Sequence, residues 1–458
     1  MAVSTPPGRG GIGIVRLSGP ATIAIVGELV DVRGELEQAQ ARFARVFDPF
    51  DHAQVIDEAL VTAFHGPHSY TGEDLVEIAT HGSPVVLGAL LDAALDAGRR
   101  LELDVRLAEP GEFTQRAFLN GRLDLTQAEA VHDVIAARTL EQVRTAAQQL
   151  GGAMSRRVAP AKEQLVHLIA LLEAGMDFAS GELDDVDVVP PGLIAESIGA
   201  VIAPLSALAA SFQRGRLERE GATVALIGLP NAGKSSLFNR LLERKRSIVT
   251  AAPGTTRDTI EEIASLEGIP IRLIDTAGLR DGDGGEALHE AEVEGIARTR
   301  EALADAELVL FVHDANSEMT AEEQEVLVSL VGRPYLLVEN KIDLVGEFVA
   351  MGTKTKESVR ISASTGDGVH GLHAAMLREL SAGAVAETGA LNNKRQQETV
   401  TAALEALEAA SGANASGLPH ELLLMDLHRG LDALDALTGE TTSDDILGRI
   451  FSTFCIGK

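Results

Sequence analysis

The sequence predicts a protein of three parts: an N-terminal α+β domain, a helical domain made of two chain segments, and an inserted, doubly wound α/β domain. The chain has 458 residues, enough for about three domains. Strand-like and helical runs alternate in residues 217–382, and Ala-, Leu- and Gln-rich sequence flanks that segment on both sides. We therefore expect residues 121–216 and 383–458 to pack into one helical domain, with two independent helical pieces as the alternative.

Composition and charge restrict the classes of function. The chain is 45% hydrophobic and 23% charged, as globular proteins are, and its net charge is −29. A broad face for nucleic acid needs clustered Lys and Arg, so we expect no DNA binding and only a local or partner-supplied RNA contact. The single cysteine, Cys455, excludes an intrachain disulfide and fits a reducing cytoplasm. We find no signal-peptide core and no apolar stretch long enough to span a bilayer, which predicts a soluble, cytoplasmic protein without a membrane partner.

Residues 1–120 combine strands with a helix. Ala59–Phe64 and Asp74–Ile78 have the pattern of strands, and a helical stretch lies near 84–97. The segment Gly8–Gly13 fits the G-x-G-x-x-G fingerprint of dinucleotide-binding proteins, but that fingerprint must follow a strand and open a helix. Two prolines precede it here and the strand-like run Ile14–Leu17 follows it, so we reject a dinucleotide site.

Helical sequence begins near residue 123. Thr126–Glu129 fits a capping box, and apolar residues follow it at helical spacing. Those residues are Ala130, Val131, Val134 and Ile135. Residues 396–458 are also expected to be helical, with leucines along one face at positions 422, 423, 427, 431 and 434.

The inserted segment opens with a phosphate-binding motif. The apolar, β-prone run Ala222–Ile227 precedes Gly228–Ser235, which has the form G-x-x-x-x-G-K-S, and a helical run follows. The glycines allow successive N–H groups to point inward, and the helix N-terminus adds its dipole. Lys234 would reach the β- and γ-phosphates, and the Ser235 hydroxyl would bind Mg²⁺.

Four further motifs have the order and spacing of a guanine-nucleotide switch. They are Pro253–Asp258, Asp275–Gly278, Asn340–Asp343 and Ser362–Ser364. We expect Thr256 to bind Mg²⁺, Asp275 to hold it through water, and the Gly278 N–H to sense the γ-phosphate. Asp343 would accept from guanine N1–H and N2–H₂, a donor pair that adenine lacks, and backbone N–H groups of Ser362–Ser364 would close over the base.

The complete set of predicted GTP contacts takes in these motifs. It comprises Asn231, Ala232, Gly233, Lys234, Ser235, Ser236, Thr250, Thr255, Thr256, Asp275, Thr276, Ala277, Gly278, Asn340, Lys341, Asp343, Ser362, Ala363 and Ser364. Lys234 and Thr256 also belong to the predicted catalytic residues.

Leu279 occupies the position at which a Ras-like switch carries a water-orienting glutamine. Hydrolysis therefore needs another group to position water and another source of positive charge. Glu286, Glu290, Glu292 and Glu294 are candidates, and most of them are expected to form a solvated helix face.

Five motifs outside the inserted segment stand out: Thr5–Gly11, Ser69–Asp74, His81–Gly82, Pro110–Leu125 and Thr442–Lys458. They resemble those of one family, the tRNA-modifying GTPases called MnmE. The resemblance extends over the whole chain. It implies a folate-binding and dimerisation domain at 1–120, a helical domain from 121–216 and 383–458, and a G domain at 217–382. It also implies a homodimer, a heterotetramer with the FAD-dependent MnmG, and modification of C5 of the tRNA wobble uridine with 5-formyl- or methylene-tetrahydrofolate as one-carbon source.

The resemblance further implies individual residue roles. Arg16, Glu77, Arg122 and Lys458 match folate contacts. Asn231, Thr250, Ala252 and Thr255 match a site for K⁺, an ion that takes the part of an arginine finger when G domains dimerise. Glu292 matches the catalytic, water-orienting glutamate, although Glu290 or Glu294 fits if the register shifts by two residues.

Cys455 has three interpretations. The last four residues only superficially resemble a prenylation box, because Gly and Lys are poor final residues. A buried structural cysteine is the common case, and the resemblance instead places Cys455 near the folate site as a catalytic residue.

Two other classes of function compete with a GTP-hydrolysing tRNA-modification enzyme. A regulatory or ribosome-assembly GTPase would use the same nucleotide motifs without folate chemistry, and would have no use for the N-terminal domain and the terminal motif. A dynamin-like GTPase would need a membrane-binding helix, which the sequence does not suggest.

Overall fold

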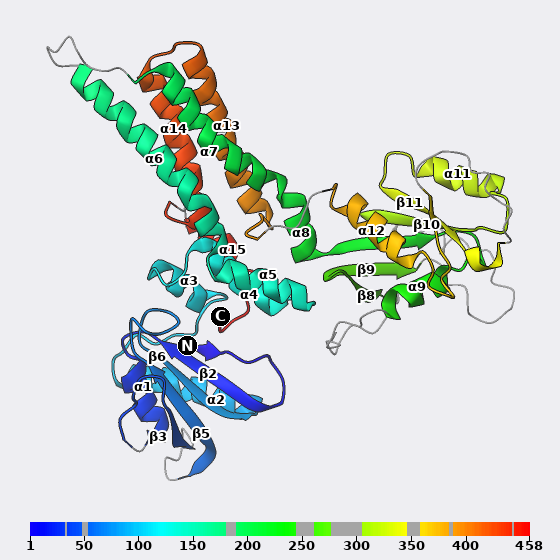
Figure 1. Cartoon of the computed structure of the whole chain (residues 1–458). Coiled ribbons are helices and arrows are strands. Elements are labelled where there is room, and N and C mark those ends of the chain that lie inside the picture. The colour runs from blue at the N-terminus through cyan, green and yellow to red at the C-terminus, as the bar shows by residue number, and fades with distance from the viewer. Residues whose placement is uncertain are drawn as a thin grey trace. The chain divides into compact units, whose positions relative to one another are not determined.

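The computed structural model describes residues 1–32, 34–47, 54–179, 189–243, 261–275, 305–345, 358–383, 388–441 and 444–458 (Figure 1). The chain forms two compact units. Unit 1 comprises Met1–His132, Leu150–Gly152 and Asp435–Lys458, and unit 2 comprises Asp133–Gln149 and Ala153–Leu434. The predicted combination of an α+β part, a helical part and an α/β part is confirmed, whereas the domain limits at residues 120, 216 and 382 stay predictions.

A six-stranded antiparallel sheet forms most of unit 1, in the order β1-β2-β6-β5-β4-β3. The strands are β1 (Ala2–Val3), β2 (Gly10–Ser18), β3 (Val30–Val32), β4 (Ala41–Phe47), β5 (Val55–Phe64) and β6 (Leu75–Gly82). Helices α1 (Thr22–Leu29) and α2 (Pro84–Arg100) pack on one face (Figure 1). In the second half of β5 every second residue (Ala59, Val61 and Ala63) is buried under them, as expected for a strand with one covered face. Gly10–Gly13 lies in β2, so this segment lacks the strand-to-helix setting that a dinucleotide fingerprint needs.

The rest of unit 1 joins α3 (Glu112–Leu119) and most of α4 (Leu125–Ala136) to α15 (Asp444–Phe451). Leu125 and Ala128 of α4 form a small core with Leu447, Phe451 and Phe454. The last residues of the chain continue from α15 to the start of α3, where Ile456 pairs with Pro110 in an antiparallel bridge. Residues from the two ends of the chain therefore share one compact unit.

The predicted capping box of α4 is two residues out of place. Gln127 N–H donates to Asp124 Oδ1 (2.8 Å) and Asp124 N–H donates to Gln127 Oε1 (2.9 Å), so Asp124 is the cap. Thr126 lies inside the helix and is buried, and its hydroxyl donates to Asp124. The D-x-x-Q pair prevails over T-x-x-E because it leaves Thr126 and Glu129 to the buried face.

Unit 2 contains a helical bundle built from both chain segments, as predicted. Its helices are α5 (Leu140–Leu150), α6 (Ala153–Ala179), α7 (Pro191–Ala210), α8 (Phe212–Glu220), α13 (Lys394–Ala415) and α14 (His420–Thr438). Helix α7 contacts both α6 and α13. The predicted leucine face of α14 is partly wrong: Leu423, Leu427 and Leu434 are buried and Leu431 is partly buried, but Leu422 is 46% exposed. Leu424, which the prediction left out, is buried. Three consecutive leucines at 422–424 leave the helix face ambiguous in the sequence.

The prediction that no apolar stretch is long enough to span a bilayer is also wrong, because one helical segment has the necessary length and composition. Pro191–Glu220 is long and apolar enough to do so. One stripe of its large side chains, among them Ile194, Ile198 and Val201, is nevertheless buried at helical spacing, as in a helix of a packed bundle, whereas Leu193 is 44% exposed.

The α/β part of unit 2 is a six-stranded sheet in the order β12-β11-β10-β7-β9-β8. Its strands are β7 (Ala222–Ile227), β8 (Glu261–Leu266), β9 (Ile269–Asp275), β10 (Leu308–Asp314), β11 (Tyr335–Asn340) and β12 (Ser358–Arg360). Among these described strands, β8 pairs antiparallel with β9 and the other pairs are parallel. Helices α9 (Lys234–Glu243) and α12 (Val369–Leu380) pack into one apolar core of the sheet, and α11 (Ala321–Ser329) into another (Figure 1). A doubly wound sheet places its ligand site at the carboxyl ends of the parallel strands.

The chain enters and leaves the α/β part through two segments that contact each other. Helix α8 leads into β7, and residues 388–393 lead from the α/β part into α13. The Leu391 N–H donates to Ser211 Oγ (3.2 Å), and Gln149 Nε2 donates to the Ala390 carbonyl (2.9 Å). Gly215 lies so close to Leu391 that a Cβ would overlap the Leu391 carbonyl oxygen. Backbone packing at this glycine thus joins the two connections.

Candidate functional site

The loop between β7 and α9 has the backbone that a phosphate site needs. Gly228 and Gly233 have positive φ angles of 149° and 94°, and Asn231 has a φ of 62°. A Cβ on Gly228 would overlap the Val312 carbonyl oxygen, and one on Gly233 would overlap Asn340 Nδ2. Both glycines are therefore required by close approach as well as by conformation.

Lys234 begins α9 and is buried. Its Nζ donates to the carbonyl oxygens of Gly228 and Leu229, both at 2.9 Å. These contacts hold the ammonium group over the loop at the helix N-terminus, where the loop N–H groups and the helix dipole favour an anion. Ser235 and Ser236 lie in the first turn of α9. The hydroxyl and ammonium groups of this turn fit a Mg²⁺-bound polyphosphate.

Asn340 joins the phosphate loop to the predicted base-binding loop. It ends β11 and is 1% exposed. Its Nδ2 donates to the Ala232 carbonyl (3.0 Å), and its Oδ1 accepts from the Ala363 N–H (2.9 Å). The neighbouring Lys341 has a φ of 64° and donates to Asp314 Oδ2 at 2.7 Å. Burial opposes the charge of Asp314, but hydrogen bonds from Lys341 and Asn316 outweigh it and lower the Asp314 pKa.

Asp343 lies fully exposed in the short 3₁₀ turn η1 (Ile342–Leu344). The hydroxyls of Ser362 and Ser364 lower its pKa by hydrogen bonding, and Ser364 Oγ donates to its Oδ2 at 3.3 Å. An ionised carboxylate that only accepts suits the guanine donor pair. The structure thus brings together Asn340, Lys341, Asp343 and the loop Ser362–Ser364, as the sequence predicts.

Several predicted residues lie outside the described residues. They are Thr250, Ala252, Thr255, Thr256, Thr276, Ala277, Gly278, Glu286, Glu290, Glu292 and Glu294. Asp275 is described by its backbone: it ends β9 and pairs in register with Leu226 of β7. Strands β9 and β7 therefore end at the same edge of the sheet, next to the phosphate loop.

A second predicted site lies in unit 1. Arg16 of β2 and Glu77 of β6 are opposite each other in register. Arg16 donates to Glu77 Oε1 through Nη2 (2.6 Å) and Nε (3.0 Å), and through Nη1 to the Gly457 carbonyl (3.3 Å). Its guanidinium carbon lies 5.8 Å from the centre of the Tyr70 ring and 5.6 Å from that of Phe113. The guanidinium thus lies within cation–π distance of two aromatic rings.

Lys458 belongs to this site. Its carbonyl accepts from the Phe113 N–H (3.2 Å), and burial together with the nearby charge of Arg16 lowers the pKa of its side chain. Arg122 follows α3 within the motif Pro110–Leu125. Its Nε donates to the carbonyl oxygen of Ser69, the residue before Tyr70 (3.1 Å). The structure therefore joins Arg16, Glu77 and Lys458, and places Arg122 against the Ser69–Asp74 segment.

Cys455 is exposed, so its interpretation as a buried structural cysteine is wrong. Its carbonyl accepts from the Lys458 N–H (3.3 Å) in the turn that ends the chain. Tyr70, Phe113 and Gly457 were missed as site residues. Tyr70 and Phe113 lie inside recognised motifs, but Gly457 contributes a backbone carbonyl, which leaves no side-chain pattern.

Ion pairs to the Glu112 carboxylate stabilise the start of α3 beside this site. Glu112 accepts from Arg106 Nη2 (2.7 Å), Arg116 Nη2 (2.8 Å) and the Glu109 N–H (2.9 Å). Burial raises the pKa of Glu112, but these donors outweigh it and bring the pKa down to about 2. Arg116 also contacts Glu73 Oε2 (2.9 Å), which ties α3 to the Ser69–Asp74 segment.

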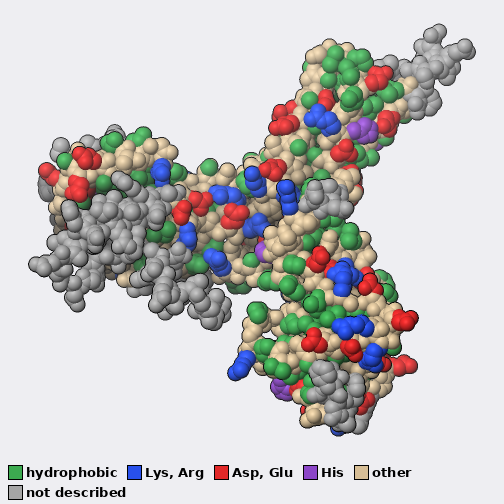
Figure 2. Space-filling view, turned by 180° about the vertical axis from the view of Figure 1, so that it is seen from behind, with side chains coloured by type: hydrophobic (Ala, Val, Ile, Leu, Met, Phe, Trp, Pro, Cys, Tyr) green, Lys and Arg blue, Asp and Glu red, His purple; other side chains and the backbone are tan. Residues whose placement is uncertain are grey.

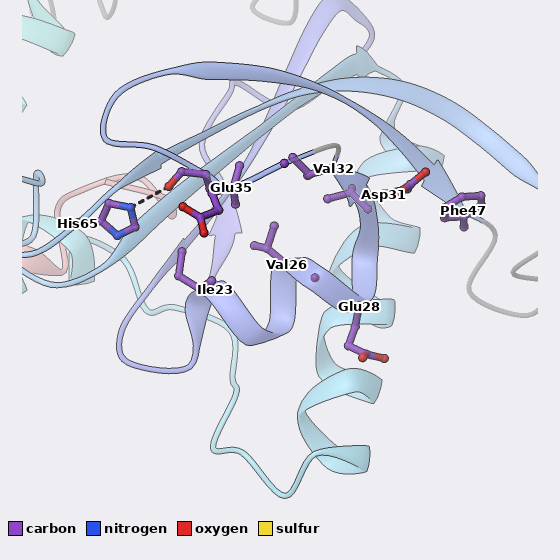
Figure 3. A pocket seen from close by; sticks show the side chains of 12 residues that line it. Ile23, Val26, Glu28, Asp31, Val32, Glu35, Phe47 and His65 are labelled. Atoms are coloured by element: carbon purple, nitrogen blue, oxygen red, sulfur yellow. Dashed lines mark hydrogen bonds between the residues drawn. The ribbon is translucent and has the colours of Figure 1, made fainter.

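A pocket of about 780 Å³ lies elsewhere in unit 1, beside α1 and β3 (Figure 3). Ile23, Val26 and Val32 line it together with the carboxylates of Asp31 and Glu35, and His65 Nε2 lies 2.9 Å from the Leu36 carbonyl oxygen. None of its lining residues belongs to a motif that the sequence singled out.

A mostly parallel sheet with a P-loop after β7 and an Asn-Lys-x-Asp motif at the end of β11 defines a P-loop GTPase domain. Residues 1–122 match the family model described as GTP-binding protein TrmE N-terminus, and residues 125–455 match that of the MnmE helical domain. The tRNA modification GTPase MnmE of Koribacter versatilis is 52% identical over 463 residues, which cover 100% of this chain and 98% of that protein. The protein of the same name from Aquifex aeolicus is 38% identical over 459 residues, or 100% and 99% of the two chains. The chain belongs to the MnmE family of tRNA modification GTPases.

Among solved structures, Era of Aquifex aeolicus bound to GDP·AlF₄⁻ is 24% identical, with a TM-score of 0.27 over 40% of this chain and 66% of that one. A likeness of that size carries no argument about function.

Proposed function

We propose that this protein is the K⁺-dependent, GTP-hydrolysing component of the system that adds an aminomethyl or carboxymethylaminomethyl group to C5 of the tRNA wobble uridine. It uses a tetrahydrofolate one-carbon donor and acts with the FAD-dependent MnmG. The observation that carries the proposal is the pairing, in one chain of this family, of a guanine-nucleotide site with a second site built by Arg16, Glu77 and the end of the chain. A plain GTPase switch has no use for the second site.

Guanine selection depends on Asp343. Its carboxylate accepts from N1–H and N2–H₂ of guanine, and adenine offers no such pair. Replacing Asp343 by Asn turns an acceptor into a group that also donates, so the preference for GTP over ATP should fall. Competition binding with the two nucleotides measures this, and an unchanged ratio would contradict the base-binding role.

Hydrolysis depends on K⁺ because the chain has Leu279 where a Ras-like GTPase has glutamine. Asn231, exposed in the phosphate loop with a positive φ, is the described member of the proposed K⁺ set, which also includes Thr250, Ala252 and Thr255. Bound there, K⁺ would supply positive charge beside the phosphates. Ser235 and Thr256 would hold Mg²⁺, and Glu292 would orient water. GTP hydrolysis should therefore be fast in KCl and slow in NaCl, and Asn231→Ala should remove the difference. Equal rates in both salts would reject the K⁺ site.

The site around Arg16 fits a folate. A reduced folate carries a planar ring with donor groups and a glutamyl carboxylate. Arg16 and Arg122 offer cations for the carboxylate, the half-buried Glu77 offers an acceptor, and Tyr70 and Phe113 provide rings against which a planar group can stack. When bound, the folate supplies the one-carbon unit. The protein's part is to orient the folate and exclude water, with Cys455 and Lys458 beside the site.

Deletion of Cys455–Lys458 tests this assignment. The described tail contacts the N-terminal domain, through Gly457 to Arg16 and through Lys458 to Phe113. The deletion should therefore abolish binding of 5-formyl-tetrahydrofolate in calorimetry and tRNA modification, while GTP hydrolysis stays near normal. Normal modification by the truncated protein would favour the alternative, a regulatory or ribosome-assembly GTPase without folate chemistry.

The homodimer forms through the N-terminal domain. One row of residues crosses the uncovered face of its sheet in register: Phe43, Leu60, Ala79 and Ile14. Phe43 and Leu60 are 56% and 51% exposed, which is unusual for large apolar side chains that lie directly opposite each other. Leu60→Ser should weaken dimerisation in analytical ultracentrifugation, whereas Val85→Ser, at a residue of α2 that is 80% exposed, should not. A dimer unaffected by Leu60→Ser would place the interface elsewhere.

tRNA binding depends on local contacts or on MnmG. Lys and Arg side chains are scattered among acidic ones on the face shown in Figure 2, in keeping with the net charge of −29. A cytoplasmic location follows from the substrate.

A further inference from the structure

Arg240 of α9 contacts the base-binding loop from the side of the phosphate-loop helix. Its Nε donates to the Ala363 carbonyl at 2.8 Å, and its Nη2 donates to the Ser364 carbonyl. One guanidinium thus holds two successive carbonyl groups, a geometry that the rigid fork of arginine provides and a lysine ammonium group does not. No motif of the sequence singles out this residue.

These two contacts orient the peptide groups of the loop. A trans peptide is planar, and its C=O and N–H point in opposite directions. Holding the Ala363 carbonyl toward Arg240 therefore turns the Ser364 N–H to the other side. Holding the Ser364 carbonyl turns the Thr365 N–H, which donates to Ser362 Oγ (3.1 Å).

The other N–H groups of the loop are already used. Ala363 N–H donates to Asn340 Oδ1, and Thr365 N–H donates to Ser362. Within the part of the chain that the structure describes, the Ser364 N–H has no acceptor. The Ser364 hydroxyl donates to Asp343 Oδ2, so this residue lies beside the carboxylate that is proposed to bind guanine.

We propose that Arg240 is a positioning residue for guanine recognition: it fixes the Ala363–Ser364 peptide so that the Ser364 N–H donates to O6 of the base. Guanine then accepts at O6 and donates from N1 and N2 to Asp343. Adenine would present an amino group to the same N–H, leaving two donors face to face. This inference rests on the proposed base site at Asp343, and it adds a residue from a different element that determines specificity.

The test compares GDP with 6-thio-GDP, which keeps N1–H and N2–H₂ but replaces O6 by sulfur, a weaker acceptor. Full-length Arg240→Ala should bind GDP about 10- to 100-fold more weakly, the range for lost hydrogen bonds to a charged group. Its affinity for 6-thio-GDP should fall much less, so that the preference for GDP narrows. At saturating GTP, kcat should stay within about twofold, because Lys234 still holds the phosphates. Arg240→Lys should give an intermediate loss.

Arg360→Ala is the matched control. Arg360 lies on β12, the strand that precedes the same loop, but its side chain contacts Glu339 (3.4 Å). Arg360→Ala should leave the affinities for GDP and 6-thio-GDP unchanged. A similar loss of affinity for GDP and 6-thio-GDP in Arg240→Ala would show a merely structural role for Arg240 and overturn the inference. An unchanged preference for GDP over 6-thio-GDP would also overturn it. If Asp343→Asn keeps the guanine preference while Arg240→Ala narrows the GDP preference, the Asp343 assignment fails and the role of Arg240 stands.

Discussion

Replacing Gly215 by Ala should destabilise unit 2, although helix propensity predicts the opposite. Gly215 lies inside α8, where Ala is favoured over Gly by about 1 kcal/mol. Its added Cβ, however, would overlap the Leu391 carbonyl oxygen and lie 2.9 Å from the carbonyl carbon and 3.3 Å from Ala390 Cβ. The neighbour is backbone, which cannot rotate away as a side chain could, so residues 390–391 must move.

The cost of that movement follows from what holds the segment. Leu391 is 0% exposed, its N–H donates to Ser211, and the Ala390 carbonyl accepts from the buried Gln149. A buried hydrogen bond that is broken and left unsatisfied costs about 1–3 kcal/mol, and overpacking costs about 1–3 kcal/mol. Partial relaxation and the helix-propensity gain offset some of this. We expect a net loss of about 2–4 kcal/mol in the free energy of unfolding.

Urea unfolding of the full-length protein, followed by helical circular dichroism, measures the effect. Gly199→Ala is the matched control, because Gly199 also lies within a helix, α7, and among the described residues nothing beyond its chain neighbours and the helix's own backbone comes within 4 Å of its added Cβ. The free energy of unfolding of Gly199→Ala should be about 0.5–1 kcal/mol higher than that of the wild-type protein. If Gly215→Ala were as stable as the wild-type protein, or shifted like Gly199→Ala, the close approach of the two connections would be refuted.

Two further predictions concern charge and catalysis. The pKa of Glu112 is about 2 in the folded protein against 4.5 ordinarily, so its ion pairs stabilise the fold fully above about pH 4.5 and are lost as the pH falls toward 2. Because Arg106 is more than half exposed, solvent screening leaves about 1–2 kcal/mol of stabilisation from these ion pairs. The difference in urea midpoint between pH 6 and pH 3 should therefore be smaller in Glu112→Gln than in the wild-type protein. An equal difference in the two proteins would contradict the ion-pair account. Glu292→Ala should slow GTP hydrolysis about 10²- to 10³-fold with GTP binding intact, and if Glu290→Ala or Glu294→Ala is the slow variant instead, the register is wrong and the mechanism stands.

The nucleotide site could be predicted from the sequence because its parts are local. Gly228–Ser235 is one continuous segment, and Asn340–Asp343 follows directly on β11. Parallel strands bring their carboxyl ends to one edge of the sheet, so motifs far apart in the chain meet there without any further information. Arg240 could not be found in this way, because its contacts depend on how α9 packs beside a loop more than a hundred residues later.

The errors of local prediction have local causes. Thr126 and Asp124 offer overlapping capping patterns, and only burial of the threonine decides between them. At Leu422–Leu424 three leucines in a row fit either of two helix faces, and the position of the neighbouring helices selects one. In both cases the sequence specifies the element correctly and tertiary packing determines its boundary or its face.

At the Arg16 site, the sequence motif identifies which residues take part, and the structure shows which of their atoms make the contacts. The motif marks Lys458 as a folate contact without saying which of its atoms takes part, whereas the hydrogen bonds that the structure gives to the tail are made by the backbone of Gly457 and Lys458. Gly457 has a φ of 92°, and a Cβ there would overlap the Val3 carbonyl oxygen and lie 2.9 Å from Ser4 Cα. Only glycine allows the chain end to pass so close to the first strand, and that path brings a carbonyl oxygen to the Arg16 guanidinium. The same reasoning applies to Gly233 beside Asn340. In both sites a glycine admits a neighbouring group that then fixes a charged or polar side chain, so the position of that side chain is a consequence of backbone packing that no side-chain pattern records.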